Sequence, residues 1–179
     1  MAYNTLVSGG IRFVDTSEAF GTTLHSKGLS AETLVGQFTE EYTLTTDTPL
    51  IGTTFANPYT LFAASKGNSG IRLGSGGVLG ALEKSCQRLE TSNIELYQIE
   101  NVGLLGGYVG GKGALASGLA LTIERGYCNH VGVKNVGARS LKGFQKMMEK
   151  RGASVSTNQV NTFFFGAFPV ENPIFYFAI

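Results

Sequence analysis

The sequence predicts an α/β fold built from parallel βαβ units. Short apolar runs alternate along the chain with longer amphipathic segments, and turn residues separate the two kinds. This alternation is typical of a Rossmann-type sheet or of a (β/α) barrel, and periodicity alone does not decide between them. At 179 residues the chain is long enough to bury one hydrophobic core, so we expect one domain.

The first four elements follow from apolar periodicity and turn residues. A short helix over 2–8 ends at two glycines, and the apolar strand 11–14 follows it. Ser30 is a helix cap, and the apolar spacing after it predicts an amphipathic helix to about Tyr42. The run 50–55 is the next strand, because a Thr-Pro pair precedes it and an Asn-Pro pair ends it.

The same signals continue to residue 160. Helical spacing predicts three more amphipathic helices, and short apolar runs predict three more strands. The expected helices cover 78–89, 114–125 and 138–150, and the expected strands cover 94–99, 130–133 and 154–160. Two glycine-rich connections, 59–77 and 101–113, precede the first two of these helices. Connections of this length in a compact domain usually have a function.

Composition excludes several classes of protein. A net charge of +1 offers no attraction to nucleic acid or to an anionic membrane. Cys86 and Cys128 are too few for a disulfide framework or a zinc site, and we expect both to be buried thiols in helix-like segments. No run has the roughly 20 apolar residues of a membrane span, and the first ten residues do not resemble a signal peptide. We expect a soluble chain in a reducing compartment, either the cytoplasm or an organelle matrix or stroma.

The stretch Ile11–Gly21, IRFVDTSEAFG, is the part of the chain that can be tied to a chemistry. An apolar strand runs into a polar loop, and α/β folds place their active sites at the carboxyl ends of strands. The stretch resembles the second-strand signature of the aldo-keto reductases, G-I-x-x-x-D-T-A-x-x-Y-G. Asp15 falls on the acidic position of that signature, and Phe20 falls where the family has its catalytic tyrosine.

Four further matches to the same family follow in the family's order. They are the S-E-x-x-L-G pattern at Ser30, Glu32 and Gly36, the segment 81–100, the segment 125–135 and the TNQV of 157–160. The resemblance implies a partial or incomplete (β/α)8 TIM-type barrel with about five to six parallel strands, over residues 1–162. The chain is well below the roughly 250 residues of a full barrel, so we expect a truncated member. The aromatic tail 163–179 is expected to pack on the barrel or on a partner.

The resemblance implies that the catalytic set is degenerate. The family uses a tyrosine as general acid, a lysine and an aspartate that tune it, and a histidine that orients the carbonyl. Of these four positions only Asp15 keeps its residue type. The tyrosine, lysine and histidine positions hold Phe20, Thr54 and Glu100, which remove the proton donor, its charged partner and the carbonyl clamp.

The resemblance also assigns three cofactor-binding positions. The family holds the nicotinamide carboxamide with a serine, an asparagine and a glutamine, which correspond to Lys134, Asn135 and Gln159. Two of these three residue types survive, and the family's phosphate and adenine clamp lies beyond the region matched. We therefore expect these positions to be vestigial and the chain to use no cofactor, with NADP as the alternative.

Three other candidate sites are weak. GGYVGGKG, over 106–113, is close to a P-loop, but Gly113 stands where the Mg²⁺-binding hydroxyl should be, so a flexible loop is the better interpretation. His25 and His130 have no metal-ligand spacing, and no metal is expected. Glu100 beside Asp15 would form a pair of carboxylates with separated pKa values, which leaves a new acid or base there as an alternative.

These observations predict a non-catalytic aldo-keto-reductase-like protein that serves as a structural or interaction subunit of a larger assembly. Five or six barrel strands leave two open edges and an uncovered inner face, which a protein partner would cover. A membrane-associated or organellar complex is compatible with this prediction, and any association of the chain with a membrane is expected to be peripheral. The alternative is a diverged NADPH-dependent carbonyl oxidoreductase whose missing ends lie outside the given chain.

Overall fold

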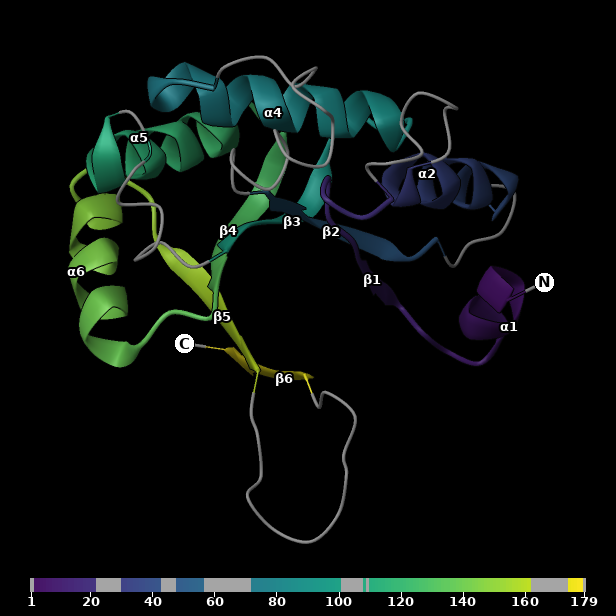
Figure 1. Ribbon diagram of the computed structural model, residues 1–179. Helices are drawn as coiled ribbons and strands as arrows, with labels where there is room; N and C mark the ends of the chain where they lie inside the picture. Colours follow the sequence, from purple (N-terminus) through teal and green to yellow (C-terminus); the bar gives the residue numbers. More distant parts are fainter. Residues whose placement is uncertain are drawn as a thin grey trace, which may run out of the picture.

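A curled sheet of six strands forms the centre of the protein (Figure 1). The computed structural model describes residues 2–21, 30–42, 48–56, 72–100, 108, 110–161 and 174–178. The strands pair in chain order, β1-β2-β3-β4-β5-β6, and the first five are parallel. They are β1 (Phe13–Asp15), β2 (Leu50–Phe55), β3 (Ile94–Glu100), β4 (Cys128–Lys134), β5 (Val155–Asn161) and β6 (Ile174–Ala178). The predicted partial (β/α)8 barrel is confirmed as five parallel strands in a curled half-barrel.

Helices lie between the strands in sequence and cover the convex side of the sheet (Figure 1). They are α1 (Ala2–Ser8), α2 (Ala31–Tyr42), α4 (Gly74–Arg88), α5 (Gly111–Glu124) and α6 (Ala138–Glu149). Ser30 caps α2 as predicted, since its Oγ accepts a hydrogen bond from the Thr33 backbone N–H at 3.1 Å. Within the described residues, no helix is long and apolar enough to cross a membrane.

Two helices begin earlier than the sequence predicts. α4 begins at Gly74 and α5 begins at Gly111, so glycines assigned to loops form the first helical turns. Glycine weakens a helix interior, but the first turn makes few internal hydrogen bonds and tolerates it better. The segment 106–113, interpreted as a flexible loop rather than a P-loop, therefore ends inside α5, and most of its residues before Gly110 lie outside the described part of the chain.

The end of the chain adds a strand that apolar periodicity did not predict. β6 runs antiparallel to β5, with Gln159 opposite Tyr176 and Asn161 opposite Ile174. The predicted tail 163–179 therefore begins outside the described residues and ends in the sheet. Its division from 1–162 as a separate unit stays a prediction.

The hydrophobic core lies between the convex side of the sheet and the helices. Tyr97, Ile99 and Val131 point into it from the sheet and are fully buried. Gly36 allows a close helix contact, because a Cβ there would lie 2.7 Å from the Leu89 carbonyl carbon. α2 and the end of α4 can therefore pack backbone against backbone.

Both cysteines are buried in this core, as predicted, and Cys86 lies in a helix as expected. Cys128 was expected in a helix, but it is the first residue of β4, because the strand begins two residues earlier than its apolar run. Burial raises the pKa of each thiol to about 11. Neither thiol is therefore a nucleophile at neutral pH.

Candidate active site

An ion pair joins the carboxyl ends of the first and fourth parallel strands. The Lys134 ammonium, at the end of β4, donates to Asp15 Oδ2, at the end of β1, at 2.7 Å. The two side chains are 12% and 15% exposed. β2 and β3 lie between their strands, so the Lys134 side chain reaches across the concave side of the curled sheet. The sequence did not predict this contact between residues 119 positions apart.

The predicted cofactor positions gather beside this pair. Gln159 on β5 is the strand partner of Lys134, and its Oε1 is buried without a hydrogen-bond partner. Asn135 follows Lys134 with a left-handed backbone, φ 56°, and its N–H donates to the Gln159 carbonyl at 2.7 Å. Asparagine tolerates this conformation better than most residues. The three positions thus lie together at one end of β4 and β5.

A row of largely polar residues crosses the concave face, two residues before Lys134 and Gln159 on their strands. Sheet register places Thr54, Gln98, Gly132 and Thr157 side by side on β2, β3, β4 and β5. Gln98 Nε2 donates to Thr157 Oγ1 at 3.3 Å, over Gly132. A Cβ at position 132 would overlap that hydroxyl, so only glycine leaves room for this contact. Thr54 Oγ1 and Gln98 Oε1 are buried acceptors without a partner.

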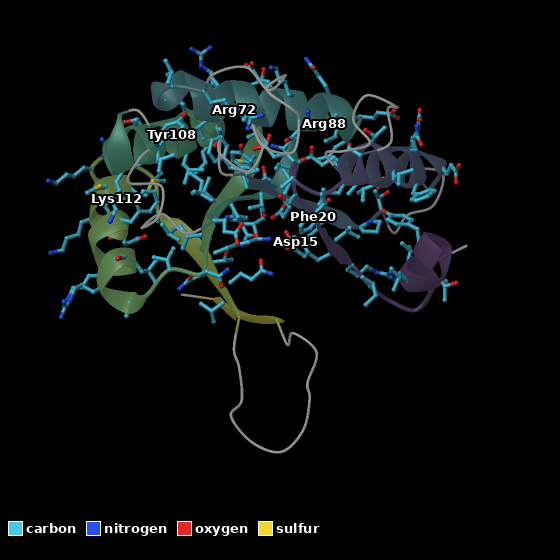
Figure 2. All side chains as sticks on the ribbon, in the orientation of Figure 1. Asp15, Phe20, Arg72, Arg88, Tyr108 and Lys112 are labelled. Atoms are coloured by element: carbon cyan, nitrogen blue, oxygen red, sulfur yellow. The ribbon has the colours of Figure 1, made fainter. Side chains whose placement is uncertain are left out.

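The other two altered positions, Phe20 and Glu100, lie on different elements. The Phe20 side chain is 56% exposed in the loop after β1, close to Asp15 (Figure 2). That loop runs alongside β2, where the Thr16 N–H donates to the Gly52 carbonyl at 2.9 Å. Glu100 is exposed at the end of β3 and accepts a long hydrogen bond from Asn135 Nδ2 at 3.4 Å. Asp15 has Lys134 as a partner, and the alternative of a carboxylate pair with Glu100 stays a prediction.

A second group of charges lies on the helix side of the sheet and was missed by sequence reasoning. We call it the buried charge network and define it as Glu18, Glu32, Arg72 and Arg88. Arg72 Nη1 donates to Glu18 Oε1 and Arg88 Nε donates to Glu32 Oε2, both at 2.6 Å. The two carboxylates are 1% and 0% exposed. The network connects the loop after β1, α2, α4 and the residue pair before α4.

Backbone and side-chain donors add to this network, and Glu18 Oε2 is its one carboxylate oxygen without a hydrogen bond. Glu18 Oε1 also accepts the Ala56 N–H at 2.7 Å, and Glu32 Oε1 accepts the Thr53 hydroxyl at 2.6 Å. Arg88 Nη2 lies 3.9 Å from Glu18 Oε2. Burial still dominates at Glu18 and raises its pKa, although the hydrogen bond and charge of Arg72 lower it. Burial lowers the pKa of Arg72, but Glu18 outweighs it and the net direction is upward.

The remaining sequence candidates form no site in the described residues. His25 lies outside them, and His130 Nε2 faces Glu95 at 3.4 Å on the surface. No group of three potential metal ligands occurs in the part of the chain that the structure describes. That finding leaves the expectation of no metal a prediction.

The sequence and the fold were compared with those of known proteins. A family model described as the aldo/keto reductase family matches residues 1–175. No curated protein sequence matches the chain significantly. An aldo/keto reductase from Brucella melitensis superposes with a TM-score of 0.62 at 18% identity, covering 90% of this chain and 52% of its own. The chain spans about half the length of the solved structures it matches.

Two similar structures bear on the cofactor. An aldo-keto reductase of Bombyx mori in complex with NADP matches with a TM-score of 0.58 at 19% identity, over 87% of this chain and 45% of its own. An aldo-keto reductase complexed with NADPH matches with a TM-score of 0.62 at 14% identity, over 90% and 44%. These neighbours point to a nicotinamide cofactor, so the expectation that no cofactor is used is wrong. That expectation gave too much weight to changed side chains and too little to the strand ends that carry Asn135 and Gln159.

Proposed function

The chain belongs to the aldo/keto reductase family, and from that premise we propose that it forms part of the active site of an NADP-dependent carbonyl oxidoreductase. The observation that carries the proposal is the ion pair of Asp15 and Lys134 beside Gln159. This partly buried pair lies at the carboxyl ends of barrel strands, which is where this architecture performs its chemistry.

The residues present fit the nicotinamide end of the cofactor. Gln159 Oε1 is a buried acceptor without a partner, and a carboxamide N–H is a donor of the matching kind. Asn135 has its backbone fixed to β5 and its side-chain amide next to the same strand end. Gln159 and Asn135 would therefore hold the carboxamide. When bound, a reduced nicotinamide supplies the hydride for carbonyl reduction.

The chain's own groups would then act on the substrate oxygen. The ammonium of Lys134 is a positive charge at a largely water-excluded position, which would stabilise negative charge that develops on a carbonyl oxygen. Asp15 holds this ammonium in place. Thr54 Oγ1 and Gln98 Oε1 line the concave face below it and accept hydrogen bonds from a substrate or from water.

The proposal is tested by titrating the purified protein with NADPH and following the nicotinamide fluorescence. We expect saturable binding and oxidation of NADPH with members of an aldehyde panel. Gln159→Leu should raise the Kd for NADPH about tenfold, because loss of one buried hydrogen bond costs on the order of 1–2 kcal/mol. Gln37→Leu, on the exposed face of α2, is the matched control and should bind like the unchanged protein. Absence of both binding and turnover would reject the proposal.

A second candidate is a non-catalytic role as a structural or interaction subunit with a protein partner. Phe20 favours it, because this exposed aromatic ring has no acidic proton and stands at the position of the family's proton donor. An exposed ring of this size is a common anchor in protein interfaces. This candidate predicts that the protein is soluble only together with its partner and that Phe20→Ala weakens the complex. A soluble, active protein without a partner would exclude it.

A further inference from the structure

The family's tyrosine and lysine positions hold residues that cannot donate a proton as an acid, but Lys134 contacts the remaining Asp15. Phe20 has no hydroxyl and Thr54 has no ammonium, so neither can supply the charge or the proton of the family's pattern. Lys134, at a position where the pattern has a serine, places its Nζ 2.7 Å from Asp15 Oδ2. The acidic position of the pattern therefore has a lysine partner again, but from β4 instead of β2.

Three other tyrosine hydroxyls of the described residues lie in other surroundings. The Tyr97 hydroxyl belongs to the core on the helix side of the sheet, where burial raises its pKa well above the ordinary value. The Tyr108 hydroxyl donates to the Gly74 carbonyl at 2.7 Å, and the Tyr3 hydroxyl pairs with Thr39 at 2.7 Å. Lys134, in contrast, has a proton to give and lies directly against Asp15.

We propose that Lys134 has replaced the lysine missing at Thr54 and that its ammonium is the proton donor of the reduction. This inference rests on the proposed function. As the carbonyl carbon accepts the hydride from a reduced nicotinamide dinucleotide, the π electron pair moves to the carbonyl oxygen. That oxygen forms an O–H bond with a proton of Nζ, and one N–H bond of Lys134 breaks. The neutral amine that remains regains its proton from solvent, and Asp15 keeps the side chain in position.

The kinetic test compares three variants. Lys134→Met keeps the length and removes the proton, and Lys134→Arg keeps the charge but holds its protons permanently. Both should lower kcat with NADPH and an aldehyde by at least about 100-fold, the usual contribution of a general acid. Lys142→Met on α6, an exposed lysine outside the site, should leave kcat unchanged.

A second readout does not depend on activity. Urea unfolding of the unchanged protein, Asp15→Asn, Lys134→Met and the double variant forms a double-mutant cycle. We expect the double variant to lose less stability than the sum of the two single losses, because either single change already breaks the same ion pair. The cycle for Asp15 and Lys142 should be additive.

The outcomes separate this inference from the proposed function. Large losses of kcat in both Lys134 variants, together with a coupled cycle, support the inference. Turnover within threefold of the unchanged protein in Lys134→Met overturns it and leaves the proposed function standing. Full activity in Lys134→Arg overturns proton donation, and an additive cycle overturns the ion pair. An unchanged protein that neither binds NADPH nor oxidises it overturns the proposed function and this inference together.

Discussion

The protein holds two groups of charges, one on each side of its sheet, and they differ in how many donors surround them. The buried charge network lies beside α4. Arg88 belongs to this helix, and Arg72 lies two residues before it (Figure 2). Asp15 lies on the concave side, with Lys134 as its partner. In the network the two carboxylates receive donors from two arginines, a threonine and a backbone amide. On the concave side, buried acceptors at Thr54, Gln98 and Gln159 have no partner.

This difference separates a structural role from a chemical one. A buried charge is tolerated when hydrogen bonds and opposite charges surround it. In the network three of the four carboxylate oxygens accept hydrogen bonds, and the fourth, Glu18 Oε2, faces Arg88 Nη2 at 3.9 Å. Acceptors left open cost stability unless a ligand or water completes them. We therefore assign the network to stability and the concave face to binding, and the following variants test that assignment.

The largest loss of stability is expected from Arg88→Met. This change leaves Glu32 buried without its main charged partner, which typically costs about 3–5 kcal/mol. Urea unfolding followed by circular dichroism measures the free energy of unfolding. The control Arg139→Met removes an exposed arginine on α6 and should change the free energy of unfolding by less than about 0.5 kcal/mol. Equal effects of the two variants would contradict a structural role for the network.

Gly132→Ala should have the next largest effect. The added Cβ would overlap the Thr157 hydroxyl and crowd Gln98, so the polar row must shift, at a cost of about 1–3 kcal/mol. Gly143→Ala in α6 meets nothing within 4 Å and should instead stabilise the protein by roughly 0.5–1 kcal/mol. Thermal unfolding of both variants checks the opposite signs. A rise in Tm for Gly132→Ala would show that the row is looser than its geometry indicates.

Lys134→Met should lower stability less than Arg88→Met does. Its partner Asp15 is 15% exposed and stays partly hydrated when the ammonium is lost, so we expect about 1–2 kcal/mol. Urea unfolding measured beside Arg88→Met gives the ratio. A loss as large as that of Arg88→Met would make the concave pair a structural element in its own right.

The smallest effect concerns pH. Burial raises the folded-state pKa of Glu18 above its unfolded value of about 4.3, so the folded protein keeps this proton to higher pH than the unfolded chain. The free energy of unfolding should therefore fall as pH rises from the unfolded value through the raised folded value, and this part of the pH dependence should then stop. Glu18→Gln should remove this part of the pH dependence, and the exposed Glu124→Gln should leave it unchanged. Identical profiles for all three proteins would show that Glu18 does not titrate there.

Sequence periodicity predicted the strands and helices but not the contacts between charges. The run 50–55 was assigned without error because its flanking prolines mark both ends. α4 and α5 began earlier than expected because glycine content hides the start of a helix. Asp15, Asn135 and Gln159 were found through their pattern and do lie at strand ends.

The contact between Lys134 and Asp15 depends on the curl of the sheet. Four strands must bend before two positions so distant in sequence face each other, and no local signal encodes that bend. Glu18 and Glu32 were hidden for a related reason, since a charged residue is normally read as exposed. Their burial follows from partners contributed by two other segments, and long-range pairing of this kind is invisible to a window of ten or fifteen residues.

The strand order has a consequence for how the chain is made. Each parallel strand pairs with the one that precedes it in sequence, so no parallel strand must wait for a distant, later segment to find its place. A growing chain can add one helix and one strand at a time to the edge already formed, in the order in which a ribosome releases them. Synthesis at about 5–20 residues per second is slow compared with helix formation. Vectorial assembly during translation is thus built into the topology, with the newest strand always the exposed one.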